Sequence, residues 1–356
     1  MPHYKLMKRE TESITARVTV PVLSILMALL FGWVFLWFYG INPVETYLRM
    51  WQGAFGDSYA LSETLVKAIP LMLLGLGLSL AFRMKLWNIG AEGQLNMGAF
   101  AASGIALSFS HLPAIILLPF MALAGFVAGG LWALIPGTLR AYWDVNETIT
   151  TLMLNYVAIF WVDSLIFGPW KDPASMGFPL SPRFAAHAYL PAIAGTRVHI
   201  GLLIALLMAV LFYFLLQYTR WGYEIKVVGE SPAAARYAGI SVVKNILLVM
   251  LISGGIAGLA GMIEVTGITH RLQQGISPGY GYTAIIIAWL GGLNPFAIII
   301  VAFLFGALLV GGFGLQIYGL PFSIVLMLQG AVLFFLLGGE IFTKYRLQRL
   351  GKGTNQ

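Results

Sequence analysis

The sequence has no cysteine and few charged residues. The absence of cysteine excludes disulfide bonds, a thiolate nucleophile and a cysteine-ligated metal site. Charged residues make up 10% of the 356 positions, hydrophobic residues make up 59%, and the mean hydropathy is +0.84. A soluble domain carries roughly 25% charged residues. The composition therefore excludes an ordinary soluble domain and indicates an integral membrane protein.

Motifs that would indicate nucleotide or metal chemistry are also missing. The sequence contains neither a GxxxxGK[ST] nor an HExxH pattern. The histidines lack the spacing of metal ligands and fall at predicted membrane edges or near a chain end: His3, His111, His187, His199 and His270. We therefore expect a chain that is not an enzyme, with no catalytic residue and with no metal or cofactor bound by the chain itself.

Long apolar stretches predict the fold class. A bilayer core of about 30 Å requires about 20 apolar residues per helix. The stretches predict an all-α, polytopic membrane protein with about ten transmembrane helices. The expected spans are 18–41, 64–82, 92–110, 114–135, 148–167, 199–217, 244–268, 279–291, 296–318 and 321–340.

The basic residues predict the orientation of these spans. The formal net charge of +7 could indicate nucleic-acid binding, but Lys and Arg gather in the cytoplasmic loops of membrane proteins. With the N-terminus inside, most basic residues fall in inner segments. We therefore expect no nucleic-acid partner and two cytoplasmic termini, with a cytoplasmic segment at 1–17, a transmembrane domain at 18–340 and a basic tail at 341–356.

The orientation also depends on a break between two spans. A single helix over 279–318 would leave the basic tail outside. The sequence GGLNP (291–295) offers paired glycines and a proline, which end helices. We expect short or broken helices there and near 88–96.

Two polar segments are long enough to have functions. The outer segment, 168–199, is rich in proline and is either an irregular loop with an extracellular contact or a plain connector. The inner segment, 218–245, contains GESPAAARYAG, in which Ser231 can cap a helix, Pro232 can begin it and Gly239 can end it. A short capped helix between two spans is typical of a docking element, and the alternative is a solvated connector.

Several motifs, taken together, resemble one transporter family. They are KLWNIGAEGQ (85–94), DVNETITTLMLNY (144–156), GYEIKVVGESPAAARYAGI (222–240), SGGIAGLAGMIEV (253–265) and SPGYGYTAIIIAWLGGLNP (277–295). They are similar to the permease subunits of bacterial ABC importers in the ribose and branched-chain amino acid superfamily. The NIGAEGQ element resembles the branch that carries nucleosides with a basic membrane lipoprotein as receptor.

This resemblance implies a function and a set of partners. The chain would be the transmembrane permease subunit of an ATP-driven nucleoside importer, a multi-pass protein of the bacterial cytoplasmic (inner) membrane. Its partners would be an ATP-binding subunit that uses ATP and Mg, a second permease subunit (sister chain or self), an extracytoplasmic substrate-binding lipoprotein and the lipid bilayer. The loop 218–243 would couple the chain to the ATPase. The expected contact residues are Glu224, Glu230, Arg236 and Tyr237.

The segment NIGAEGQLNMG (88–98) is the first candidate for the translocation path or gate. Its glycines each lower helix stability by about 1 kcal/mol relative to alanine, and non-helical backbone at membrane depth is tolerated only where it lines a cavity or is buried in protein. The side chains of Asn88, Glu92, Gln94 and Asn96 could hydrogen-bond a ribose or a base edge. Alternatively, the segment is a cytoplasmic turn in which Glu92 caps the next helix, so that these residues gate or brace.

Other polar residues within predicted spans extend the candidate path. Glu264 is either a path or gate residue or an outer acid paired with Arg271. Nearby small residues four apart, such as Gly254 and Gly258, predict close helix packing. One helical face carries further path candidates, which are Thr148, Thr151 and Asn155. Trp161 and Tyr280 could stack on a base or belong to an interfacial aromatic belt.

Three other classes of function can be weighed against the same sequence. A permease for simple sugars of the ribose type fits the same architecture. An ion-coupled secondary transporter would also use broken helices but has no need of a capped cytoplasmic docking helix. An intramembrane enzyme would need a nucleophile and a base or a set of metal ligands, and we expect neither in this chain.

Overall fold

The computed structural model describes residues 4–8, 14–193 and 195–349. The chain divides into two compact units. One unit consists of Met1–Gly53 with Gly311–Gln356, and the other is Ala54–Val310.

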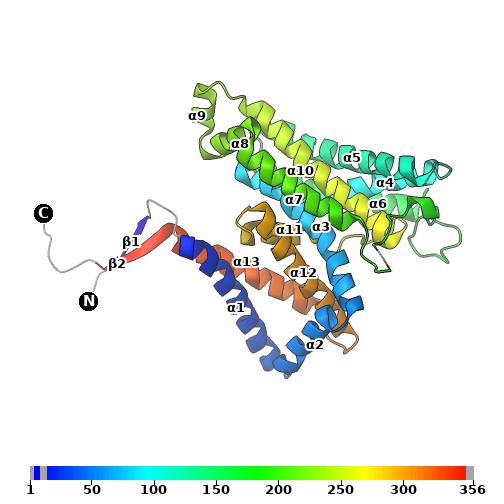
Figure 1. The fold of residues 1–356 in the computed structure, drawn as a ribbon, viewed down its shortest axis with the longest axis horizontal. Coiled ribbons are helices and arrows are strands. Elements are labelled where there is room, and N and C mark those ends of the chain that lie inside the picture. The colour runs from blue at the N-terminus through cyan, green and yellow to red at the C-terminus, as the bar shows by residue number, and fades with distance from the viewer. Residues whose placement is uncertain (1–3, 9–13, 194, 350–356) are drawn as a thin grey trace, which may run out of the picture. The chain divides into compact units, whose positions relative to one another are not determined.

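The first unit pairs the two ends of the chain. Its elements are β1 (Tyr4–Lys8), α1 (Ile14–Phe38), most of α2 (Pro43–Phe55), α13 (Ser323–Lys344) and β2 (Tyr345–Arg349). α1 packs on α13, and β1 pairs with β2 in antiparallel register, with Tyr4 opposite Arg349. Figure 1 shows this strand pair beyond the ends of the two helices. The first and last described segments of the chain therefore lie side by side.

The second unit contains the remaining helices, except that the last residues of α12, from Gly311, belong to the first unit. They are α3 (Ser58–Arg83), α4 (Ala91–Ser108), α5 (Ala114–Trp143), α6 (Glu147–Phe167), the short 3₁₀ turn η1 (Ala186–Ala188), α7 (Gly201–Tyr218), α8 (Arg220–Glu230), α9 (Pro232–Tyr237), α10 (Val242–Glu264), the π-helical turn η2 (Val265–Thr269), α11 (Tyr280–Leu290) and α12 (Pro295–Gln316). α10 packs against α5, α4 and α3 and is the centre of this bundle, as Figure 1 shows.

Glycine contacts set the spacing of the central helices. A Cβ at Gly98 would overlap the backbone of Gly258 on α10, and a Cβ at Gly258 would overlap the carbonyl of Gly125 on α5. Gly254 likewise meets the backbone of Gly129. The predicted close packing of the small residues on α10 is confirmed, because backbone rather than side chains fills the contact.

The helices agree with a polytopic membrane protein. Within the described residues, the helices long and apolar enough to cross a membrane are Thr19–Phe38, Ser58–Arg83, Ala114–Trp143, Glu147–Phe167, Gly201–Tyr218, Val242–Thr269 and Pro295–Gln316, seven in all. The helices α4, α11 and α13 also coincide with predicted spans but fall outside that group. The predicted break is confirmed, because α11 ends at Leu290 and α12 begins at Pro295. Two helices, α2 and α8, were not expected from the sequence.

The glycine packing predicts a selective loss of stability. Gly258→Ala should destabilise the protein by about 1–3 kcal/mol, since overpacking against backbone cannot be relieved by a rotamer change. Gly330→Ala on α13 is the matched control, because no atom lies within 4 Å of the added Cβ. Thermal unfolding of the detergent-solubilised protein measures the difference. Equal melting temperatures for the two variants would contradict the packing argument.

Candidate functional site

The segment before α4 is held by a pair of amide side chains. Asn88 donates from Nδ2 to Oε1 of Gln94 (3.1 Å), and Gln94 donates from Nε2 back to Oδ1 of Asn88 (2.9 Å). Asn88 Nδ2 also donates to Oγ of Ser253 on α10 (3.1 Å). Both amides are buried. These bonds fix the irregular backbone at 84–90 against the centre of the bundle.

The face of α6 completes this cluster. Asn155 accepts a hydrogen bond from the backbone N of Gly93 (2.8 Å) and donates to the carbonyl of Ile89 (2.8 Å). Thr151 Oγ1 accepts from the N of Ile89 (3.2 Å). We call Asn88, Gln94, Thr151 and Asn155 the amide cluster. The structure brings these four predicted residues together, whereas Thr148 lies at the start of α6 and its backbone N bonds the capping Asn146.

Glu92 joins the N-termini of two helices. It lies in the first turn of α4, and its Oε2 accepts a hydrogen bond from the backbone N of Gly281 in α11 (2.7 Å). It also hydrogen-bonds the side chain of Ser277. A carboxylate is favourable at helix N-termini because unpaired N–H groups and the helix dipole are positive there. A Cβ at Gly281 would overlap the backbone of Glu92, so only glycine permits this approach.

Ser277 belongs to a pentapeptide that resembles a catalytic motif. GISPG (275–279) has the GxSxG spacing of a serine nucleophile elbow. In the structure, Ser277 Oγ instead accepts hydrogen bonds from the N of Gly279 (3.2 Å) and of Tyr280 (2.8 Å). Ser277 therefore caps the start of α11.

These contacts give the segment 88–98 a bracing geometry. Asn88, Glu92, Gln94 and Asn96 are each at most 6% exposed, and Asn96 donates to the carbonyl of Glu92 (2.8 Å). Their hydrogen-bonding groups are used largely within the chain, on one another and on the backbone. The segment 88–96 is not a break within one helix, because α3 ends at Arg83 and α4 begins at Ala91. α4 starts inside the bundle, beside the start of α11.

Glu264 has a different partner from the one considered from the sequence. Its Oε1 lies 3.6 Å from Nζ of Lys67 on α3, so the suggested pairing with Arg271 is wrong. Its Oε2 has no hydrogen-bond partner among the described residues, and neither has the hydroxyl of Tyr280. Lys67 Nζ lies 5.8 Å from the centre of the Tyr280 ring. The pairing of Lys67 with Glu264 was not expected from the sequence, because α3 and α10 are distant in the chain.

The aromatic candidates are placed apart. Tyr280 is buried, whereas Trp161 is 49% exposed and meets Phe100 edge-on (6.1 Å between centroids). Trp87 and Trp289 are stacked with 5.6 Å between their centroids. The stacked pair of Trp87 and Trp289 holds the end of α11 against the segment that leads to α4.

The inner loop has the predicted short helix. Ser231 Oγ accepts a hydrogen bond from the N of Ala234 (3.2 Å), Pro232 is the first residue of α9, and Gly239 has a φ of +73°. The predicted start and stop of this helix are therefore confirmed. Figure 1 shows α8 and α9 at one end of α10.

The residues expected to contact an ATPase lie in and around this loop. Glu230 and Arg236 line a cleft of about 620 Å³ between α9, the end of α8, the end of α5, the start of α10 and the segment 84–86 that follows α3. Tyr237 is 97% exposed. Glu224 instead accepts a hydrogen bond from Nδ2 of Asn245 (3.1 Å) and lies 3.3 Å from Arg220, so its contacts brace the loop.

The outer segment 168–199 is largely irregular but is attached to the bundle. The N of Ser181 donates to the carbonyl of Leu272 and the N of Phe184 to that of His270, both at 2.9 Å. His199 is buried, and its ring lies beside Gly267 of η2. These hydrogen bonds attach the segment 168–199 to the backbone of residues 266–273.

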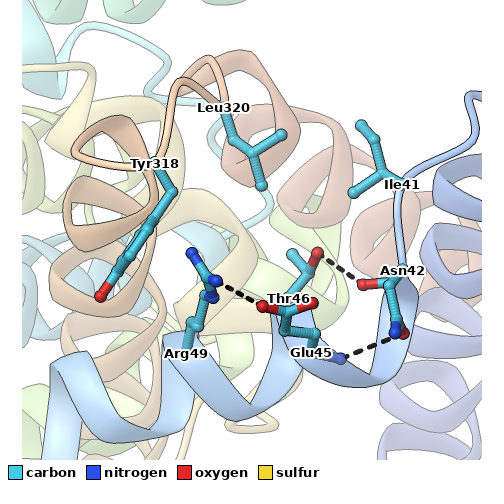
Figure 2. A pocket seen from close by; sticks show the side chains of 7 residues that line it. All are labelled: Ile41, Asn42, Glu45, Thr46, Arg49, Tyr318 and Leu320. Atoms are coloured by element: carbon cyan, nitrogen blue, oxygen red, sulfur yellow. Dashed lines mark hydrogen bonds and ion pairs between the residues drawn. The ribbon is translucent and has the colours of Figure 1, made fainter.

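A small cavity lies in the first unit. It measures about 170 Å³ and is lined from α2 and the turn after α12 by Ile41, Asn42, Glu45, Thr46, Arg49, Tyr318 and Leu320, as Figure 2 shows. Arg49 pairs with Glu45, and its guanidinium lies 3.7 Å from the centre of the Tyr318 ring. The charged groups that line this cavity are thus already paired with one another.

In the described part of the chain, no three His, Asp or Glu side chains gather to hold a metal ion.

The chain is similar to known permeases over most of its length. It is 41% identical to the glucose ABC transporter permease protein TsgB13 of Haloferax volcanii, with 92% of this chain and 89% of that protein covered. It is 34% identical to the guanosine ABC transporter permease protein NupP of Bacillus subtilis (90% and 93% covered) and 32% identical to the nucleoside ABC transporter permease protein NupB of Lactococcus lactis (90% and 91% covered).

Among solved structures, PsaBC from Streptococcus pneumoniae in complex with Fab covers 82% of this chain at 15% identity, with 95% of that chain covered and a TM-score of 0.41.

The model of the family described as "Branched-chain amino acid transport system / permease component" matches residues 59–337. This match includes the amide cluster, Glu92, Glu264 and the inner loop, and the chain therefore belongs to this permease family of ABC transporters.

Proposed function

We propose that this chain is the transmembrane permease subunit of an ATP-driven nucleoside importer in the cytoplasmic membrane. The observation that carries the proposal is the family match over residues 59–337, together with relatives named as guanosine and nucleoside permeases that align over 90% of the chain. The NIGAEGQ element favours the same substrate class. The chain forms the path, and a separate subunit hydrolyses ATP with Mg.

Glucose is the second candidate substrate. The relative at 41% identity is named as a glucose permease. Nucleosides and glucose are both neutral and both carry neighbouring hydroxyl groups. A path for either therefore needs hydrogen-bonding side chains without a net charge, which amides and a paired carboxylate provide.

Within this function, the amide cluster and Glu92 support the path. They hold the starts of α4 and α11 in place, so their loss changes the shape of the gate. Asn96, Thr148 and Glu264 remain path or gate residues in this proposal. Discontinuous helices that meet inside a bundle are typical of substrate sites in transporters.

The inner loop couples the permease to its ATPase. α9 leads into α10 through the capped turn at Gly239 and Ser241. α10 carries Ser253, which bonds the amide cluster, and ends at Glu264. A force on α9 therefore reaches both the cluster and the ion pair through one helix.

The topology and the remaining partners complete the proposal. The pairing of β1 with β2 supports an even number of spans, because paired ends lie on the same side of a membrane. The distribution of basic residues favours ten spans with cytoplasmic termini. A second permease subunit and an extracytoplasmic substrate-binding lipoprotein complete the importer, as expected for ABC importers.

Coupling is tested by charge reversal on the inner loop. Glu230→Lys with Arg236→Glu should lower uptake by about tenfold or more, since misplaced charges at an interface cost several kcal/mol. The conservative pair Glu230→Asp with Arg236→Lys should retain uptake. Uptake in cells is measured together with the amount of inserted protein. Normal uptake by the reversed variant would remove α9 from the ATPase contact.

Topology is tested by cysteine labelling, because the chain has no cysteine of its own. Met176→Cys should react with an impermeant thiol reagent from outside, since Met176 is 94% exposed in the outer segment. Ala234→Cys on α9 should react only after the cells are opened. External labelling at 234 would reverse the proposed orientation.

The substrate is tested by uptake in cells that contain the complete transporter, with and without this chain. Radiolabelled guanosine, adenosine and uridine should be taken up in a chain-dependent manner, and ribose and glucose should not. Chain-dependent uptake of glucose but of no nucleoside would replace the nucleoside assignment by the sugar one.

A further inference from the structure

The bundle contains a second polar group that the amide cluster does not use. Lys67, Glu264 and Tyr280 come from α3, α10 and α11, three helices that meet in the second unit. We call these residues the ion-pair site. Its carboxylate is buried, whereas the Lys67 side chain is 21% exposed. The cation can therefore be reached from outside the bundle, and the acid lies behind it.

Two polar atoms of this site are unsatisfied within the protein. Glu264 Oε2 and the Tyr280 hydroxyl are both buried without a hydrogen-bond partner among the described residues. A buried polar group without a partner is unfavourable, and an ionised one more so. The amide cluster, by contrast, is closed by its own hydrogen bonds. The ion-pair site thus keeps hydrogen-bonding capacity for a ligand.

The position of the site suits a translocated ligand. Lys67 is nine residues after the start of α3, which corresponds to about 14 Å along the helix. The predicted span begins at residue 64, so Lys67 lies about 5 Å inside the outer end of that span, where an incoming substrate would enter. Glu264 directly precedes η2, and π-helical turns are frequent at functional sites.

The chemistry of the site indicates a neutral ligand with neighbouring hydroxyls. The ion pair has no net charge, so it does not favour an anion or a cation. Glu264 Oε2 can accept a hydrogen bond from one hydroxyl, and the Lys67 ammonium has three donors, which leaves capacity for a second hydroxyl. The Tyr280 hydroxyl can donate or accept.

We infer that Lys67, Glu264 and Tyr280 form a binding site for the vicinal hydroxyl groups of the transported substrate. This inference rests on the proposed function as an importer of a neutral substrate, and it names Lys67 and Tyr280 as path residues in addition to Glu264. The shared chemistry is a vicinal diol. The diol belongs either to the ribose of a nucleoside or to a hexose.

The test compares substrates with and without the hydroxyls, using the complete transporter in cells. Uptake of radiolabelled guanosine and of 2′,3′-dideoxyguanosine is measured for the wild type and for Glu264→Gln. We expect guanosine uptake to fall about tenfold in the variant, as for the loss of a charged hydrogen bond, while uptake of the dideoxy compound stays unchanged. The preference for the hydroxylated substrate should therefore collapse.

Matched variants separate binding from folding. Glu63→Gln removes a carboxylate one helical turn from Lys67 on α3, where it pairs with Arg197 (2.9 Å), and should leave the preference intact. Tyr280→Phe keeps the ring and removes only the hydroxyl. It should lower the preference for guanosine and keeps the test open if Glu264→Gln does not insert. An equal loss of both substrates, or no change in the preference in either variant, would overturn the inference.

A second arm distinguishes this inference from the proposed function. If the wild type carries glucose and no nucleoside, the nucleoside assignment fails, and the ratio of glucose uptake to the uptake of 2,4-dideoxyglucose, which has no vicinal hydroxyl pair, then tests the site. A collapse of that ratio in Glu264→Gln supports the diol site. Uptake of neither compound class by the wild-type transporter would overturn both proposals.

Discussion

Satisfaction of polar groups inside the bundle is the constraint on which the rest of the structure depends. A membrane offers no water to unpaired backbone groups, so a helix that begins within the bundle needs an acceptor from the protein. Glu92 provides it for α11 through the N of Gly281, and Asn155 provides it for α4 through the N of Gly93. The start of α11 is thereby held by a side chain of α4, and the start of α4 by a side chain of α6.

The packing of the central helices makes these bonds possible. α10 approaches α4 and α5 at glycines, where backbone contacts backbone. This closeness lets Ser253 reach Asn88 and lets Glu264 reach Lys67. A wider spacing would separate the same donors and acceptors. The glycines and the polar residues therefore act as one arrangement, in which the former set the distance that the latter use.

The bundle contains two kinds of polar site with different capacities. The amide cluster is closed, because its amides bond one another and nearby backbone. The ion-pair site keeps a carboxylate oxygen and a phenol without protein partners. A closed network fixes a shape, whereas an open one can exchange partners. This difference, rather than residue type, separates bracing residues from candidate binding residues.

The sequence by itself determined the membrane class, the positions of the apolar helices, the break at 291–295 and the start and stop of α9, since these depend on local composition, caps and helix-breaking residues. It also brought out the residues of the amide cluster, because NIGAEGQ and the polar face of α6 are visible as local patterns. It did not give α2, which begins where the Asn42 side chain accepts hydrogen bonds from the N of Val44 and of Glu45. Only the tertiary structure decided that Glu92 reaches Gly281 and that Glu264 pairs with Lys67 rather than Arg271. These contacts join residues 189 and 197 positions apart, and no local pattern specifies which distant helices pack together.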